Sequence, residues 1–157
     1  ILFEEATAEI FSDVFNLAKT NLLGQTSSGT VADGEIEQDG QWLLWDNKRR
    51  AGNFKLGAST RAKIKSYIDT KSQQHDVEWF LIIAPEFSES AEQNALKLEM
   101  QSGVDIRLVR AEDFRRLAII WHDKFSGSDR ELPLSIFTGS GEFDLDIVED
   151  TLATQFS

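Results

Sequence analysis

The chain has 157 residues, 41% of them hydrophobic and 27% charged, which predicts one soluble domain built on a sizeable hydrophobic core. It has no cysteine and no apolar run of about 18 residues, which excludes a disulfide framework, a thiolate metal site and a membrane span and favours a cytoplasmic setting. The net charge of −11 argues against a general nucleic-acid binder.

The first stretch of the chain has helical periodicity. Apolar residues recur at helical spacing from about Phe3 to Leu23, which predicts one amphipathic helix. Gly24 is the expected stop, and the Ser, Gly and Thr residues of 25–30 predict a loop. Because the chain begins at Ile1 without a methionine, we interpret it as a fragment or a processed product.

A β-hairpin is predicted next. Asp39-Gly40 is a strong signal for a two-residue turn. The two strands are expected at 34–38 and 41–48. Because side chains alternate along a strand, Leu44, Asp46 and Lys48 should share one face of the second strand. The opposite face is also apolar, so this strand is expected to be central in its sheet.

The remaining chain alternates between helical and strand patterns. Helices are expected at 58–71, 88–101, 111–124 and 144–152. Strands are expected at 79–84, 104–109 and 134–137. This order of elements predicts a mixed sheet with helices packed on it, an α/β sandwich.

Basic residues gather in one segment of this acidic chain. Between Gln41 and Lys71 there are eight basic and two acidic residues, a net charge of +6. The rest of the chain has 8 basic and 25 acidic residues, a net charge of −17. A basic segment on an acidic body predicts a local anion site, with a solvated helix face as the alternative.

Three polar residues of the hairpin have the chemistry for phosphodiester hydrolysis. Asp33 precedes the first strand, and Asp46 and Lys48 stand near the end of the second, so the turn brings them to one end of the sheet. Two carboxylates and a backbone carbonyl, most simply that of Asn47, can hold Mg²⁺, which prefers oxygen ligands. A lysine ammonium beside them can orient a metal-bound water and stabilise charge on a phosphate.

A structural interpretation of the same residues stays open. Asp-x-Lys is a common tripeptide, and Asp46 and Lys48 could form a salt bridge without a catalytic role. Burying these charges is costly unless they are paired or bind a metal. The position of Asp33 at the start of the hairpin favours the catalytic interpretation.

The ordered context of these residues resembles a known nuclease signature. The run Ala32-Asp33-Gly34-Glu35-Ile36, the hairpin and then Asp46-Asn47-Lys48 resemble the PD-(D/E)XK nuclease superfamily. More narrowly, the chain is similar to the cleavage domain of FokI-like type IIS restriction endonucleases. That similarity runs through Glu9-Ile10-Phe11, Leu22-Leu23-Gly24, Leu56-Gly57, Tyr67-Ile68 and Val109 to Leu117. The family's proline before the first aspartate is Ala32 here, a residue that shapes the backbone and takes no part in the chemistry.

The resemblance implies a fold, a site and a cofactor. The implied fold is a restriction-endonuclease-like α/β/α sandwich with a central mixed β-sheet, one cleavage domain over 1–157 of a larger restriction enzyme. Asp33 and Asp46 are implied as metal ligands and Lys48 as the catalytic lysine, with Mg²⁺ as cofactor and Mn²⁺ as a substitute. Glu9 lies where related nucleases often place a helical carboxylate near the metal. Glu4 and Glu5 are nearby alternatives, and a solvent-exposed Glu9 is the competing interpretation.

The basic segment has two expected uses. Arg49, Arg50 and Lys55 are expected to contact DNA phosphates. The resemblance implies that the next helix, which carries Arg61, Lys63 and Lys65, pairs two cleavage domains as a homo- or heterodimer, since one site cuts one strand. No base-reading motif is visible, so specificity is assigned to a recognition domain or subunit outside this chain.

The leading hypothesis is a Mg²⁺-dependent endodeoxyribonuclease, the cleavage domain of a type IIS-like restriction enzyme that acts on double-stranded DNA in a prokaryotic-type cell. Two alternatives stay open. The acidic stretch from Glu142 to Asp150 suggests a nuclease-like fold that serves as an interaction or dimerisation module without activity. The chain could instead be another PD-(D/E)XK nuclease, such as a repair enzyme.

Overall fold

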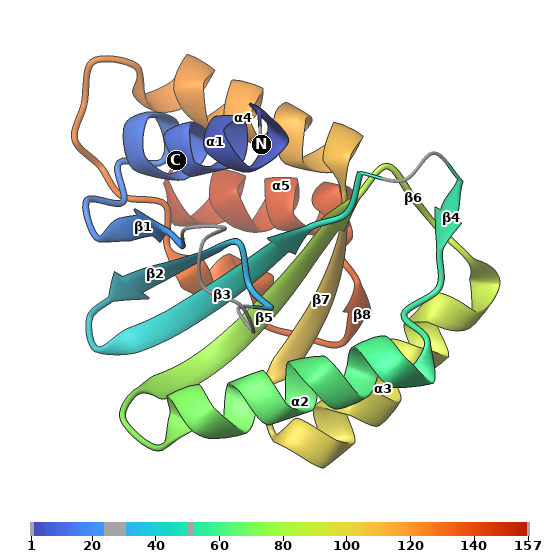
Figure 1. The fold of residues 1–157 in the computed structure, drawn as a ribbon. Coiled ribbons are helices and arrows are strands. Elements are labelled where there is room, and N and C mark those ends of the chain that lie inside the picture. Colours follow the sequence, from blue (N-terminus) through green and yellow to red (C-terminus); the bar gives the residue numbers. More distant parts are fainter. Residues whose placement is uncertain (1, 24–30, 50–51, 157) are drawn as a thin grey trace.

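A six-stranded mixed β-sheet forms the centre of the computed structural model, which describes residues 2–23, 31–49 and 52–156 (Figure 1). The strands, in spatial order, are β1 (Thr20–Leu22), β2 (Gly34–Gln38), β3 (Gln41–Asn47), β5 (Asp76–Ala84), β7 (Asp105–Arg110) and β8 (Gly141–Glu142). β1, β2 and β3 pair antiparallel, whereas β3, β5, β7 and β8 run parallel to one another. The carboxyl ends of β3, β5 and β7 therefore meet along one edge of the sheet.

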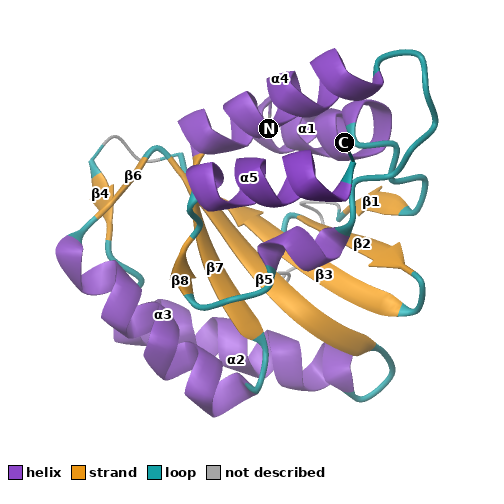
Figure 2. Ribbon diagram, turned by 180° about the vertical axis from the view of Figure 1, so that it is seen from behind, coloured by secondary structure: helices purple, strands orange, loops and turns teal. Residues whose placement is uncertain are grey.

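Helices cover both faces of the sheet (Figures 1 and 2). One face packs against α1 (Leu2–Glu9), the π-helical turn η1 (Ile10–Val14), α4 (Ala111–Phe125), the 3₁₀ turn η2 (Leu134–Phe137) and α5 (Leu145–Gln155). The other face packs against α2 (Ala58–Ser72) and α3 (Glu89–Ser102). This arrangement confirms the expected α/β/α sandwich. Beside the sheet, β4 (Asn53–Phe54) and β6 (Glu86–Phe87) form a separate parallel pair.

The central strands are buried on both faces, because their apolar side chains alternate between two cores. In β5, Trp79 and Leu81 pack in the core beneath α4 and α5, while Phe80 and Ile82 pack against α2 and α3. Each such side chain contributes roughly 1.5–3 kcal/mol when it leaves water. The prediction that the second hairpin strand is central is confirmed, since β3 lies between β2 and β5.

The predicted helix from Phe3 to Leu23 is wrong in its second half. Helical structure ends with η1, and Thr20–Leu22 form the edge strand β1. Asn16 has a φ of 59°, a left-handed conformation that ends the helix. Its side-chain amide donates hydrogen bonds to the carbonyls of Ser128 and Arg130, contacts that no local pattern encodes. The predicted stop at Gly24 and the loop at 25–30 lie outside the described residues.

The predicted strand at 134–137 is also wrong. This segment is the turn η2, because its N–H groups bond locally or to a side chain instead of to a neighbouring strand: Ile136 N donates to Pro133 O and Leu134 N to Gln38 Oε1. β5 begins at Asp76, three residues earlier than the strand expected at 79–84. The short strands β4, β6 and β8 were not predicted. Within the described residues, no helix is long and apolar enough to cross a membrane.

Candidate active site

The β2–β3 hairpin places the two predicted aspartates side by side. Asp39 and Gly40 both have positive φ, as a tight primed turn requires, and this turn fixes the register of the strands. The N–H of Asp33 donates to the carbonyl of Trp45 at 2.8 Å, so Asp33 lies across from Asp46. Glycine is needed at position 34, across from Trp45, because a Cβ there would overlap the indole ring of Trp45.

Lys48 completes a compact group with the two aspartates. Its Nζ lies 2.9 Å from Oδ2 of Asp46, and its backbone N–H donates to Ile83 O at 2.8 Å. Oδ2 of Asp33 accepts a hydrogen bond of 2.6 Å from the backbone N–H of Asn47. The structure thus brings together the three residues on which the sequence hypothesis depends, at the carboxyl end of β3.

Burial gives these carboxyl groups unusual electrostatics. The side chain of Asp46 is only 6% exposed, and burial raises its pKa to about 7 although the Lys48 ammonium opposes the shift. Burial also raises the pKa of Asp33, against the hydrogen bond from Asn47, which lowers it. The two aspartates affect each other's pKa, so they titrate as a pair.

Asn47 joins the site to α1 through its side chain. Its Oδ1 accepts from Trp45 Nε1 at 3.0 Å, and its Nδ2 donates to Thr7 Oγ1 at 3.0 Å. The Thr7 hydroxyl in turn donates to Phe3 O. These bonds turn the Asn47 side chain away from the aspartates and hold the first helix against the end of β3. The metal-binding role predicted for the Asn47 carbonyl stays a prediction.

The helical carboxylate beside the site is Glu4. Glu9 is exposed, in agreement with the competing interpretation, whereas Glu4 is only 7% exposed and its charge raises the pKa of Asp33. Both Glu4 oxygens accept hydrogen bonds from Arg49, at distances of 2.7–3.2 Å. The sequence offered Glu4 only as an alternative, because a choice between helix faces depends on how α1 packs.

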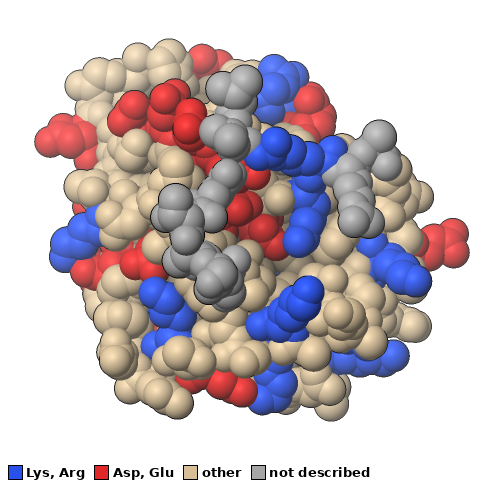
Figure 3. All heavy atoms as spheres, viewed as in Figure 1, with Lys and Arg blue, Asp and Glu red and all other residues tan. Residues whose placement is uncertain are grey.

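The other predicted DNA contacts differ in their environment. Lys55 is exposed after β4, and Arg49 is exposed over about half of its side chain even while it binds Glu4. Arg50 lies outside the described residues. Figure 3 shows Lys and Arg side chains from the end of β3 towards α2, next to an acidic group over α1. Among the basic side chains of α2, Arg61 is bound to Leu56 O and Lys65 to Asp69.

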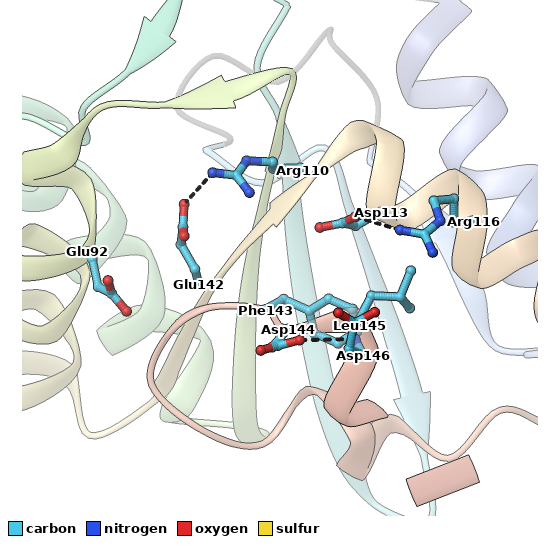
Figure 4. Close-up of a pocket in the computed structure, with 9 residues that line it drawn as sticks. All are labelled: Glu92, Arg110, Asp113, Arg116, Glu142, Phe143, Asp144, Leu145 and Asp146. Carbon is cyan, nitrogen blue, oxygen red and sulfur yellow. Dashed lines mark hydrogen bonds and ion pairs between the residues drawn. The ribbon is translucent and has the colours of Figure 1, made fainter. Parts of the chain in front are cut away.

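A hollow lies at the carboxyl end of β7 (Figure 4). It has a volume of about 410 Å³ and is lined by Glu92, Arg110, Asp113, Arg116, Glu142, Phe143, Asp144, Leu145 and Asp146. Five carboxylates thus face two arginines. Arg110 is paired with Glu142 and Arg116 with Asp113, so little positive charge remains to attract a phosphate. This hollow does not suit DNA.

The chain belongs to the FokI cleavage-domain family, since the family model for "FokI, cleavage domain" matches residues 1–130. The fold agrees with this membership. The structure of the restriction endonuclease FokI superposes with a TM-score of 0.73 at 16% identity, covering 91% of this chain and 28% of FokI. FokI bound to DNA gives a TM-score of 0.67 at 15% identity, over 78% of this chain and 24% of that one.

A similar structure of nearly equal length is the small subunit, R.BspD6I2, of the heterodimeric restriction endonuclease R.BspD6I. It superposes with a TM-score of 0.64 at 13% identity, covering 98% of this chain and 87% of the subunit. The chain therefore spans less than a third of FokI but most of this subunit. No curated protein sequence matches the chain. Fold and family together are those of a restriction-endonuclease cleavage domain.

Proposed function

We propose that the chain is a divalent-cation-dependent endodeoxyribonuclease that hydrolyses phosphodiester bonds of double-stranded DNA, as the cleavage domain or subunit of a type IIS-like restriction enzyme. The observation that carries the proposal is the group of Asp33, Asp46 and Lys48 at the carboxyl end of β3. Family membership supports the same reaction class. The FokI neighbour bound to DNA supports DNA as substrate.

The donor set fits a hard divalent cation such as Mg²⁺, with Mn²⁺ as a substitute. Oδ2 of Asp46 is buried, and the Lys48 ammonium lies 2.9 Å from it. Two adjacent carboxyl groups with raised pKa values are poorly neutralised by their surroundings, and a cation would favour their charged forms. The described residues hold no cluster of three or more Asp, Glu or His groups for a metal, so water would complete the coordination.

Each residue of the group would have a distinct role. Asp33 and Asp46 would hold the cation, with the Asn47 carbonyl as a third oxygen donor. The bound cation would supply Lewis acidity and lower the pKa of a water molecule. Lys48 would orient the attacking water and stabilise negative charge on the scissile phosphate. Burial of Asp46 keeps bulk water away from one side of the site, which strengthens these interactions.

Arg49 and Lys55 would bind DNA phosphates, and Arg50, which lies outside the described residues, would add a third cation. For Arg49 this requires a change of partner from Glu4 to a phosphate. The release of Glu4 would leave a carboxylate near Asp33 while the DNA is bound. A recognition domain or subunit outside the chain would supply sequence specificity. Pairing with a second cleavage domain through α2, as a homo- or heterodimer, would allow the second DNA strand to be cut.

The test is cleavage of plasmid DNA by the intact protein with Mg²⁺, compared with Asp46→Ala and Lys48→Ala. We expect both variants to lose activity by several orders of magnitude while they still fold and bind DNA. Lys124→Ala is a matched control, since this exposed lysine lies on α4. Full activity in either site variant would eliminate the assignment. Stable self-association without cation binding would instead favour an inactive interaction module.

A further inference from the structure

The segment that follows β3 in the sequence contacts the side chain of Lys48. Phe54, on the two-residue strand β4, places its ring beside the lysine ammonium, with Nζ 5.4 Å from the ring centroid. The face of an aromatic ring carries partial negative charge and attracts an ammonium at this distance. Lys48 thus has two partners from different segments, the Asp46 carboxylate and the Phe54 ring.

The Phe54 ring is held by residues that are distant from it in the sequence. β4 pairs with β6, which puts Phe87 against Phe54 with the two rings at 70° and their centroids 6.4 Å apart. The carbonyl of Phe54 accepts from Ser88 N at 3.0 Å, and Asn94 of α3 donates to the next carbonyl, that of Lys55. Strand pairing and these hydrogen bonds therefore fix the backbone that carries the Phe54 ring.

We propose that Phe54 is a positioning residue that holds the ammonium of Lys48 for catalysis, an inference that rests on the proposed nuclease function. A lysine side chain has four rotatable bonds, and that of Lys48 is 31% exposed, so other conformations are open to it. When a cation takes the oxygens of Asp46, the attraction between Asp46 and Lys48 weakens. The ring offers no oxygen ligand, so its hold on the ammonium persists in the cation-loaded site.

The decisive comparison uses three variants of the intact protein. Phe54→Leu keeps an apolar side chain of similar size but removes the aromatic face, and Phe54→Trp restores a stronger one. Phe87→Leu is the matched control, because it removes the ring that supports Phe54 without facing Lys48. We expect Phe54→Leu to lower kcat about two- to thirty-fold, the range that a cation–π contact of about 0.5–2 kcal/mol corresponds to.

We expect Ca²⁺ affinity, measured by calorimetry, to be unchanged in Phe54→Leu. Phe54→Trp should recover most of the lost kcat, and Phe87→Leu should lose less than Phe54→Leu. Wild-type kcat in Phe54→Leu would overturn the proposal. So would equal losses in Phe54→Leu and Phe87→Leu without recovery by tryptophan, since packing alone would then explain them.

A readout independent of cleavage separates this inference from the nuclease proposal. The ring current of Phe54 should shift the ε-methylene proton resonances of Lys48 upfield in the NMR spectrum. This shift should disappear in Phe54→Leu and persist in Phe87→Leu. If the shift behaves so but Lys48→Ala cleaves DNA normally, the contact stands and the nuclease role of Lys48 fails. If wild type cleaves DNA but shows no such shift, the positioning role of Phe54 fails.

Discussion

Replacing Asp46 with asparagine should stabilise the cation-free protein at alkaline pH while it abolishes activity. Burial raises the pKa of Asp46 from 3.8 to about 7. The folded chain holds this proton to higher pH than the unfolded chain. The stability that the folded state gains from the protonated Asp46 is therefore fully present below about pH 4. It is lost as the pH rises to about 7, so the free energy of unfolding falls across this window.

The size of the effect follows from the shift of about three pKa units. At about 1.4 kcal/mol per unit, ionisation of Asp46 costs the folded state at most about 4 kcal/mol at pH 8. Asparagine has a similar shape and cannot ionise, so it avoids this cost. The substitution also removes the attraction between Asp46 and Lys48. This loss should be smaller than the avoided ionisation cost, since the Lys48 ammonium keeps contact with water. A net gain of a few kcal/mol is expected.

Urea unfolding in EDTA at pH 5 and pH 8 measures this gain. Asp46→Asn should exceed wild type clearly at pH 8 and much less at pH 5, and Mg²⁺ should stabilise wild type but not the variant. Asp123→Asn is a suitable control, because this side chain on α4 is 76% exposed. Equal or lower stability of Asp46→Asn at pH 8 would refute the inference that ionisation of the buried Asp46 destabilises the folded protein.

Two further predictions concern packing and charge around the site. Gly34→Ala should lower the free energy of unfolding in urea by about 1–3 kcal/mol or more, because the added methyl group overlaps the Trp45 ring. Gly57→Ala is the control and should have little effect in the same assay, since the atom nearest to its added Cβ lies at 3.6 Å. Arg49→Gln should cost about 1–3 kcal/mol because it removes the charge-assisted hydrogen bonds that Arg49 donates to the buried Glu4 carboxylate. Arg49→Gln should also weaken the dependence of DNA affinity on salt concentration, measured by fluorescence anisotropy, by the amount expected for about one lost phosphate contact. An unchanged slope of log affinity against log salt concentration would exclude Arg49 from the DNA contacts.

The hairpin and its site were predictable because their signals are local. Asp39-Gly40 fixes the turn, and period-two alternation fixes which side chains share a face with Asp46. The buried strand β5 and helices α2, α3 and α4 followed from apolar runs and helical spacing. Each of these elements has enough apolar residues at the spacing of its own secondary structure to be identified, even where single residues depart from the pattern.

The remaining features depend on contacts between distant segments. The helix ends early because Asn16 bonds to carbonyls more than 100 positions away in the sequence. Glu4 reaches the site only through the packing of α1 against β3. Phe54 meets Lys48 because β4 pairs with β6, and two-residue strands show no periodicity. No sequence pattern distinguishes these contacts from their alternatives.

Crystals of the intact protein soaked in Mn²⁺ would test the cation site directly by anomalous diffraction. We expect one strong peak within ligand distance of both the Asp33 and Asp46 carboxylates, beside Lys48. An active protein whose crystals show no peak there, or a peak bound by other residues, would contradict it.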